Sequence, residues 1–342
     1  MSFKYLQTIP TADEIKRDLP LPPECATIKK IRDEEIKSAI SGAIDRFLII
    51  VGPCSAHDEN AMCDYVNRLA RLDEQVRDKL ILIPRIYTNK PRTTGEGYKG
   101  MAHQPDPLKK PDVAEGIRAI RRMHIRALSE SHLSPADEML YPENYPYLED
   151  ILSYVTVGAR SVENQHHRLT ISGIDVPAGM KNPTSGDYEV MLNSVQAAQL
   201  PHIFIYRGSE VSTTGNPYSH CILRGAVNHY GQCIPNYHYE DLVNCTERYS
   251  KRSLINPAII VDTNHANSNK KFNEQPRIAL EVMESRRNSA VLNKTVRGVM
   301  IESFIAEGSQ KPGQGEYGMS ITDPCLGWKD TEKLVLKLAG MA

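Results

Sequence analysis

Residues 47–58 of this 342-residue chain read FLIIVGPCSAHD, and this stretch decides between two fold classes. It opens with a continuous apolar run, which is typical of a parallel strand that is covered on both faces. A doubly wound nucleotide-binding sheet would require a GxGxxG pattern directly after its first strand. Here Gly52 is followed by Pro53 and Cys54, and the sequence contains no GxxxxGK[ST] motif. The stretch therefore favours a closed barrel of parallel strands over an open sheet.

Similar β-rich runs recur along the chain, with helical patterns between them. The expected strands span 47–52, 80–87, 135–140, 154–160, 176–182, 202–208, 258–265 and 297–304. Apolar residues at three- and four-residue steps predict helices over 62–80 and 113–123. Eight such units in about 300 residues predict an α/β fold, a (β/α)8 TIM barrel, over residues 46–342. We also expect a β-hairpin insertion after strand 6 and an N-terminal extension over residues 1–45, which is a candidate oligomer interface.

The composition excludes several classes of function. Lys and Arg total 41 against 42 Asp and Glu, so the net charge of −1 argues against a nucleic-acid or polybasic membrane protein. The longest apolar run is 47–51, which is too short to cross a bilayer, and the first ten residues contain no apolar signal core. Seven cysteines without a CxxC pair fit a reducing compartment rather than a disulfide framework. We therefore expect a cytoplasmic protein with no nucleic-acid or membrane partner.

Polar side chains follow most of the apolar runs. They are Cys54, Arg85, Glu138, Arg160, Lys181, Arg207, Arg224, His265 and Glu302. In a parallel barrel these strand ends converge on the face that carries active sites. Any one of these arginines could form an ordinary surface ion pair. The surplus of cations as a set predicts an anionic ligand, and the planar guanidinium suits phosphate or carboxylate oxygens best.

A metal site is a second possibility at the same face. Cys54, His265, Glu302 and Asp323 would supply a thiolate, an imidazole and two carboxylates, a donor set suited to Mn, Fe, Co or Zn. These residues are scattered along the chain, and a lone buried cysteine is more often inert packing. Spacing alone leaves both interpretations open.

Eight segments resemble, in order, the motifs of 3-deoxy-D-arabino-heptulosonate 7-phosphate (DAHP) synthase of the class I alpha type. They are VGPCSAHD, PRIYTNKPRTT, GARSVENQHHR, PAGMKNPTSGD, ILRG, DTNHANSNK, GVMIESFIAEGSQ and GMSITDPCLGW. The resemblance implies a transferase on a (β/α)8 barrel that needs a divalent metal ion. It also implies the first step of the shikimate pathway, which leads to chorismate and the aromatic amino acids, and a homodimer or homotetramer.

The resemblance also implies roles for single residues. The metal ligands would be Cys54, His265, Glu302 and Asp323. The phosphoenolpyruvate (PEP) site would be formed by Arg85, Lys90, Arg160, Lys181 and Arg224. The erythrose 4-phosphate site would be formed by Pro91, Arg92 and Thr93. Lys90, His265 and Cys54 would be catalytic. We expect Lys90 to donate a proton to the forming alkoxide, with a pKa lowered by the crowded cations.

Three alternatives stay open beside this interpretation. One is 3-deoxy-D-manno-octulosonate 8-phosphate synthase, whose family resembles KANR where this chain reads KPRT at 90–93. The second is an aminoDAHP synthase, which these residues do not exclude. The third is an inactive barrel that acts as a regulatory subunit, which the loss of a metal ligand would indicate.

The chain departs from the family pattern at two places that matter below. Asn264 stands where the pattern has a serine before the metal-binding histidine. The hairpin segment GSEVSTTGNPYS at 208–219 is short and mostly polar. A polar hairpin offers little apolar surface to an aromatic ring, so the sequence predicts weak feedback inhibition by aromatic amino acids.

Overall fold

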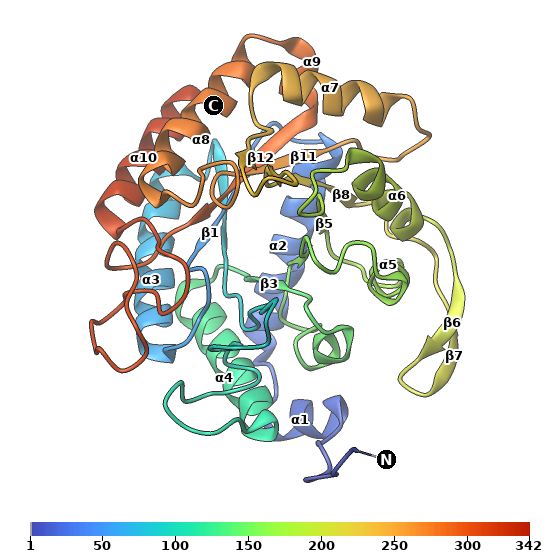
Figure 1. The fold of residues 1–342 in the computed structure, drawn as a ribbon, viewed down its shortest axis with the longest axis vertical. Helices are drawn as coiled ribbons and strands as arrows, with labels where there is room; N and C mark the ends of the chain where they lie inside the picture. Colours follow the sequence, from blue (N-terminus) through green and yellow to red (C-terminus); the bar gives the residue numbers. More distant parts are fainter. Residues whose placement is uncertain (1) are drawn as a thin grey trace.

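The computed structural model describes residues 2–342 of the chain. Its main sheet consists of β1 (Phe47–Gly52), β2 (Leu80–Pro84), β3 (Ala136–Glu138), β4 (Tyr154–Val157), β5 (Ala178–Lys181), β8 (Ser219–Leu223), β11 (Ile259–Asp262) and β12 (Val296–Glu302). These eight strands pair in the order β2-β1-β12-β11-β8-β5-β4-β3, all in parallel. A further parallel bridge between Arg85 and Ala136 joins the two ends of the sheet. The predicted (β/α)8 barrel is therefore confirmed (Figure 1).

Burial on two sides explains why the strands are continuously apolar. In β1 every residue is buried. Leu48 and Ile50 belong to an inner cluster that fills the barrel, whereas Ile49 and Val51 belong to the outer cluster between the strands and the helices. Alternating residues of one strand thus pack into two different hydrophobic clusters, so both faces of the strand must be apolar.

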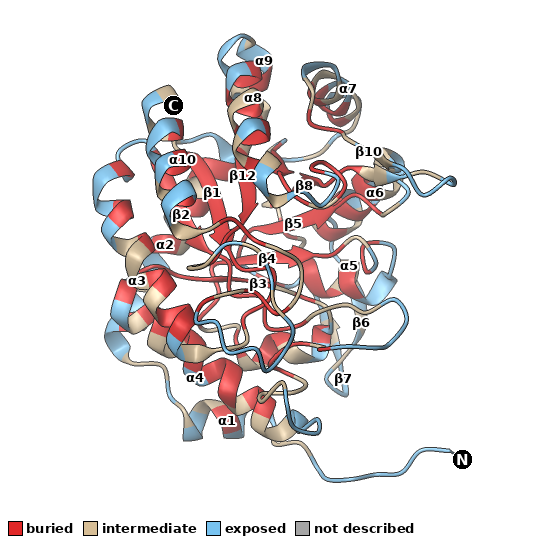
Figure 2. Cartoon of the chain, turned by 60° about the vertical axis from the view of Figure 1, so that its left-hand side comes forward, coloured by how far each residue is buried: buried red, intermediate tan, exposed pale blue. Residues whose placement is uncertain are grey.

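The outer layer consists of α3 (Glu59–Val76), α4 (Val113–Ser131), α5 (Gln165–Ile171), α6 (Tyr188–Gln199), α7 (Tyr239–Ser250), α8 (Gln275–Arg287), α9 (Ala290–Thr295) and α10 (Trp328–Met341). Two 3-10 helices, η1 (Pro142–Tyr147) and η2 (Phe272–Glu274), complete it. The third unit has only η1, because its two prolines lack the N–H that a longer α-helix needs. The helices bury their inner faces and expose their outer ones (Figure 2). Within residues 2–342 no helix has both the length and the apolar character needed to cross a membrane.

The N-terminal extension forms two helices, α1 (Ala12–Asp18) and α2 (Pro23–Ser41). Ile36, Ala39 and Ile40 of α2 are buried within the inner barrel cluster, so this helix closes one end of the barrel. In Figure 1, α2 passes behind the strands near the centre of the molecule. Part of the extension therefore has a role inside a single chain, and its role in an oligomer remains a prediction.

The prediction that 202–208 is a barrel strand is wrong. This segment forms β6 (Ile203–Tyr206), which pairs antiparallel with β7 (Ser209–Ser212) in a separate hairpin. Ile203 and Ile205 are 72% and 77% exposed, whereas a barrel strand is covered on both faces. The sixth barrel strand is β8, so this hairpin precedes it. A smaller pair, β9 (Ala226–Val227) with β10 (Cys233–Ile234), follows it.

The hairpin also offers more apolar surface than its sequence suggested. A cavity of about 280 Å³ lies against it, and its lining includes Tyr145, Ile174, Phe204, Tyr206 and Val211. The aromatic rings of the hairpin come from β6, the segment that was assigned to the barrel. The premise that the hairpin lacks apolar surface is therefore wrong.

Candidate active site

A cavity of about 250 Å³ opens where the carboxyl ends of the barrel strands meet. It is lined by Cys54, Arg85, Lys90, Pro91, Arg92, Thr93, Thr94, Glu96, Glu138, Ala159, Arg160, Lys181, Arg224, His265, Lys270 and Asp323. Loops from several strands converge on this face of a parallel barrel, which is where active sites form. Cationic side chains outnumber carboxylates in the lining, so the cavity is suited to anions.

The structure brings together nearly all the residues that the sequence singled out. Every predicted site residue except Glu302 lines the cavity. Glu302 is fully buried behind the lining, with its Oε1 atom 2.8 Å from Arg85 Nη1. Arg207 was expected at the same mouth, but it lies in the turn between β6 and β7 and lines a different cavity. It is misplaced because its strand is not part of the barrel.

Two charged lining residues were missed by the sequence analysis, Glu96 and Lys270. Lys270 ends the DTNHANSNK segment, and its backbone has a φ of 59°. The sequence hint to Lys270 was the polar run that continues past the end of the strand. The left-handed turn that directs this lysine back to the cavity cannot be read from a sequence.

Four candidate metal ligands converge on one side of the cavity. The Cys54 sulfur and one oxygen each of Glu302 and Asp323 lie within 4.8 Å of one another. His265 Nε2 is 3.7 Å from Glu302 Oε1. Glu302 Oε1 is buried, and its contact with Arg85 lacks the geometry of a hydrogen bond. A buried carboxylate oxygen beside a thiol and an imidazole fits a divalent transition-metal ion.

Burial makes the thiolate form of Cys54 unfavourable. Burial raises the pKa of Cys54 to about 11, and the nearby Glu302 carboxylate adds to this rise. Its backbone N–H faces the sulfur of Cys325 at 3.4 Å, which fixes the turn after β1. A thiolate would form here only with a cation close to the sulfur, as in a metal complex.

Lys90 already places a positive charge beside this cluster. Its Nζ lies 2.6 Å from the Cys54 sulfur and 2.8 Å from Asp323 Oδ2. Burial alone would lower the pKa of Lys90, but Cys54 and Asp323 raise it above its ordinary value. The prediction of a lowered pKa is therefore wrong, because the Cys54 sulfur and the Asp323 carboxylate, rather than cations, are the nearest neighbours of Lys90.

A second charged group lies at the ends of β5 and β11. Asp262 Oδ2 is 2.8 Å from Lys181 Nζ and 2.9 Å from His265 Nδ1. Burial alone would raise the pKa of Asp262, but His265 and Lys181 hold it well below its ordinary value. The contact with His265 lacks the geometry of a hydrogen bond, but the negative charge of an ionised Asp262 still favours a proton on His265 Nδ1. The Nε2 lone pair is then available on the side of Glu302.

Glu302 is held by amide side chains that fix both its carboxylate and its backbone. Asn264 Nδ2 donates to Glu302 Oε2 at 2.6 Å. Gln275 Nε2 donates to the Glu302 carbonyl at 2.9 Å, and Gln275 Oε1 accepts from its N–H at 2.8 Å. The asparagine that departs from the family pattern therefore orients a candidate metal ligand.

The opposite side of the cavity carries cations that protein carboxylates do not neutralise directly. Arg224 is buried, its Nη1 makes no hydrogen bond within residues 2–342, and burial lowers its pKa. Arg160 Nε donates to the Thr93 hydroxyl at 3.0 Å. A buried guanidinium atom without an acceptor is costly, so this side is built to receive an anionic oxygen.

Glu138 completes the wall between these two sides. It ends β3 and lines the cavity. The neighbouring Gly158 makes room for it, since a Cβ at that position would lie 2.0 Å from Glu138 Oε1. A carboxylate is thus fixed in the same cavity as these cations.

Comparison with known proteins agrees with this geometry. The model of the DAHP synthetase I family matches residues 27–336. The chain is 35% identical to a Tyr-sensitive phospho-2-dehydro-3-deoxyheptonate aldolase of Salmonella typhimurium, over 97% of this chain and 92% of that protein. It is 36% identical to a Phe-sensitive one of Escherichia coli K12, over 89% and 86%. A solved phospho-2-dehydro-3-deoxyheptonate aldolase of Francisella tularensis superposes with a TM-score of 0.92 at 30% identity, covering 99% of this chain and 98% of that one. The chain therefore belongs to the DAHP synthetase I family.

Proposed function

We propose that this chain condenses PEP with erythrose 4-phosphate to give DAHP and phosphate, the reaction that opens aromatic amino acid biosynthesis. One observation carries the proposal. A single cavity combines cations that lack carboxylate partners with a thiol, an imidazole and two carboxylates. The first group suits phosphate and carboxylate oxygens, and the second suits a divalent cation. The relatives are named as enzymes of the same product class.

PEP is assigned to the cationic side of the cavity. Arg160, Lys181 and Arg224 follow β4, β5 and β8, which are neighbours in the sheet. Together they form a continuous arc that can hold the phosphate and the carboxylate of one small molecule. Arg85 and Lys90, from the β2 side, complete the set. Such an arc fixes which face of PEP meets the second substrate, which is catalysis by positioning.

Erythrose 4-phosphate is assigned to the loop after β2, at Pro91, Arg92 and Thr93. Arg92 Nε donates to the Tyr98 carbonyl at 2.8 Å, which holds the guanidinium at the edge of the cavity. The hydrogen bond from Arg160 to Thr93 links this loop to the PEP side. The two phosphate sites are thus adjacent but carried by different elements.

A divalent metal ion would be held by Cys54, His265, Glu302 and Asp323. When bound, it would supply the Lewis acidity that polarises the aldehyde carbonyl of the second substrate. Within residues 2–342 the buried Glu302 Oε1 makes no hydrogen bond, and His265 Nε2 lies 3.7 Å from it, which supports this assignment. Mn, Fe, Co and Zn all suit this donor set.

The remaining chemistry falls to side chains of this chain. C3 of PEP forms a bond to the aldehyde carbon, water adds at C2, and phosphate leaves with cleavage of its C–O bond. The Lys90 ammonium group is placed to give its proton to the aldehyde oxygen as the new C–C bond forms. Glu138 is placed to orient the water that adds at C2. Arg160, Lys181 and Arg224 hold the phosphate as it leaves.

The alternatives make different predictions about substrates. A 3-deoxy-D-manno-octulosonate 8-phosphate synthase would prefer a five-carbon sugar phosphate, and an aminoDAHP synthase would give a product that retains nitrogen. An inactive barrel would use none of them, although all four candidate metal ligands are present here. The test is to incubate the purified protein and a divalent metal ion with PEP and each aldehyde, and to identify products by mass. We expect DAHP from erythrose 4-phosphate as the main product, and a better yield with another aldehyde would overturn the proposal.

We also infer that an aromatic amino acid binds in the cavity beside the β6–β7 hairpin. The relatives are named for sensitivity to tyrosine or phenylalanine. The cavity of about 280 Å³ offers the rings of Phe204 and Tyr206 and the side chains of Ile174 and Val211. Glu149 in the same lining pairs with Lys16, so a charged pair borders the apolar part of the cavity. It differs from the weak inhibition that the hairpin sequence predicts, and inhibition curves with aromatic amino acids decide between the two.

A further inference from the structure

The loop that carries Lys90 and Arg92 begins where β2 and β3 meet, and these two strands share less backbone pairing than β1 and β2 do. β1 and β2 pair continuously from Phe47 to Val51 on the β1 side. Between β2 and β3 the described residues form only the isolated bridge of Arg85 with Ala136, next to a bond from Ile86 N to the Ala136 carbonyl at 2.9 Å. Beyond this point the sheet ladder no longer fixes the chain that leads to the two substrate-binding side chains.

Where the backbone pairing between β2 and β3 ends, a buried carboxylate accepts hydrogen bonds from the chain that follows β2. Asp137 is 4% exposed and lies at the centre of β3. Its Oδ1 accepts from the Thr88 N–H at 2.9 Å and from the Glu138 N–H at 2.7 Å. Its Oδ2 accepts from the Thr88 hydroxyl at 2.5 Å. One carboxylate therefore ties the base of the substrate loop to the strand end that carries Glu138.

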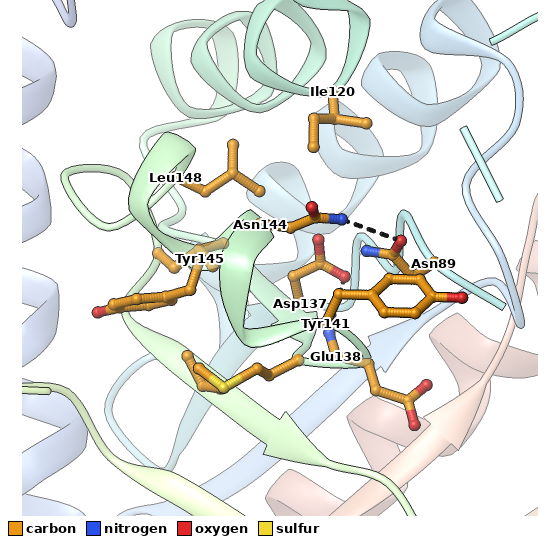
Figure 3. Close-up of a pocket in the computed structure, with 11 residues that line it drawn as sticks. Asn89, Ile120, Asp137, Glu138, Tyr141, Asn144, Tyr145 and Leu148 are labelled. Carbon is orange, nitrogen blue, oxygen red and sulfur yellow. Dashed lines mark hydrogen bonds between the residues drawn. The ribbon is translucent and has the colours of Figure 1, made fainter. Parts of the chain in front are cut away.

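The position of Asp137 follows from the alternation of side chains along β3. Ala136 belongs to the inner barrel cluster and Glu138 lines the active-site cavity, so Asp137 points outward between them. There it borders a cavity of about 20 Å³, with room for about one water molecule. Figure 3 shows its carboxylate beside Asn89 and Asn144, with the carboxylate of Glu138 directed away from it.

Among the described residues, the surroundings of Asp137 provide hydrogen-bond donors but no cation in contact with it. The nearest basic group is His124 of α4, whose Nε2 lies 4.0 Å from Asp137 Oδ2. His124 Nδ1 is 2.7 Å from the Ile120 carbonyl, which places the ring proton on Nδ1 and leaves Nε2 without one. Within residues 2–342 Asp137 therefore has no charged partner while His124 is neutral, and its hydrogen-bond partners are Thr88 and Glu138.

We propose that Asp137 is a positioning residue for the substrate loop at residues 88–99. Through Thr88 it sets where the loop leaves the barrel, and two further bonds transmit this position. Ala102 N–H donates to the Thr88 carbonyl at 3.1 Å, and Lys90 N–H donates to the Lys99 carbonyl at 3.0 Å. Asp137 touches no substrate. It acts through the loop, by holding Lys90 within reach of Cys54 and Asp323. In the same way it holds Arg92 at the edge of the cavity.

The kinetic test compares two substitutions at Asp137 with a matched control, and it rests on the proposed function. Asp137→Asn keeps an acceptor for both N–H groups, whereas Asp137→Ala removes every bond. Asp73→Ala removes another buried aspartate, on α3, whose pKa the charges of Arg32 and Arg77 lower against the effect of burial. We expect Asp137→Ala to raise the KM for erythrose 4-phosphate and lower kcat, each roughly tenfold, because small displacements of reacting groups are costly. Asp137→Asn should restore most of both.

The outcomes separate positioning from stability alone. Thermal unfolding corrects each rate for the fraction of folded protein. If Asp137→Ala and Asp73→Ala lose activity only in proportion to unfolding, with unchanged KM values, the proposal is overturned. A rise in the KM for PEP as large as the rise in the KM for erythrose 4-phosphate would also overturn the proposal, because most PEP-binding side chains lie on other strands.

A second measurement does not depend on the substrates. Hydrogen exchange should speed up in Asp137→Ala at the amides of Thr88, Lys90 and Ala102, while the Ser303 amide, which donates to Gly52, stays protected. Unchanged exchange at all three loop amides would overturn the positioning role even if the enzyme loses activity. Faster exchange in a protein that makes no DAHP would refute the proposed function and leave the positioning of the loop intact.

Discussion

Asn264 donates a hydrogen bond of 2.6 Å from its side-chain amide to Oε2 of Glu302, a candidate metal ligand. Its own Oδ1 accepts from the Ser268 hydroxyl at 2.7 Å, and its backbone N–H donates to Asp262 at 3.0 Å. The amide is thereby fixed in one orientation. Residues that orient ligands in this way tune both the affinity and the geometry of a metal site.

Asn264→Ala should weaken binding of Mn²⁺ by roughly tenfold to a hundredfold, the usual effect of removing a partner of a metal ligand. Titration of demetallated protein with Mn²⁺, followed by electron paramagnetic resonance, measures this affinity without any substrate. Asn216→Ala is the control, because Asn216 is equally buried and bonds to the Val176 carbonyl. Equal affinities in the two variants would contradict the role of Asn264.

Arg92→Ala should raise the KM for erythrose 4-phosphate far more than the KM for PEP, because Arg92 lies on the loop after β2. Arg224→Ala and Lys181→Ala should do the reverse. Loss of one charge-assisted contact to a phosphate should cost about 1.5–3 kcal/mol of binding free energy. Initial rates with each substrate varied in turn measure both constants. If all three variants affect the two substrates equally, the phosphate sites are wrongly divided.

The stability of the fold should depend on pH through Asp137. Burial raises the pKa of Asp137 to about 7, even though the hydrogen bonds from Thr88 pull it down. A carboxyl with a raised pKa stabilises the fold while it is protonated, and this contribution is lost as the pH rises through about 7. His124 does not titrate in this window, because burial lowers its pKa to about 4.

The free energy of unfolding of the wild type should therefore fall more between pH 5 and pH 8 than that of Asp137→Asn, in which the side chain cannot ionise. Urea unfolding at several pH values in this range measures the difference. Parallel curves for the two proteins would show that Asp137 keeps one protonation state throughout.

Sequence patterns predicted the barrel because its strands are apolar on both faces, a property that does not depend on distant contacts. They failed at 202–208, since a short apolar run can equally form a hairpin outside the barrel. The two structures differ in how far the apolar side chains are buried, and burial depends on the packing of the whole chain.

The candidate site was predicted largely by motif, and the structure adds what motifs do not contain. The direction of the Lys90 pKa shift depends on which charges lie nearest, and these are Cys54 and Asp323 from distant parts of the chain. The bond between Asp137 and Thr88 forms because β2 and β3 meet when the barrel closes. Neither relationship has a local sequence signal.

An aromatic amino acid should inhibit the enzyme by binding beside the β6–β7 hairpin. Phe204→Ala should relieve the inhibition, because it removes a ring from the cavity wall and with it much of the apolar contact. Tyr230→Ala, on an exposed ring outside this cavity, should not. Inhibition curves with phenylalanine, tyrosine and tryptophan are the measurement. If none of them inhibits at millimolar concentration, the cavity does not serve this purpose and the expectation from the hairpin sequence stands.

The most direct test of the account is an assay of the purified protein with PEP and erythrose 4-phosphate before and after removal of metal by a chelator. We predict that DAHP and phosphate form in equal amounts, that turnover stops on chelation, and that Mn²⁺ restores it. Cys54→Ala, which removes one candidate metal ligand, should stay inactive after Mn²⁺ is added. Full turnover by thoroughly demetallated protein would contradict the metal site, and absence of DAHP from the metal-loaded protein would contradict the proposed reaction.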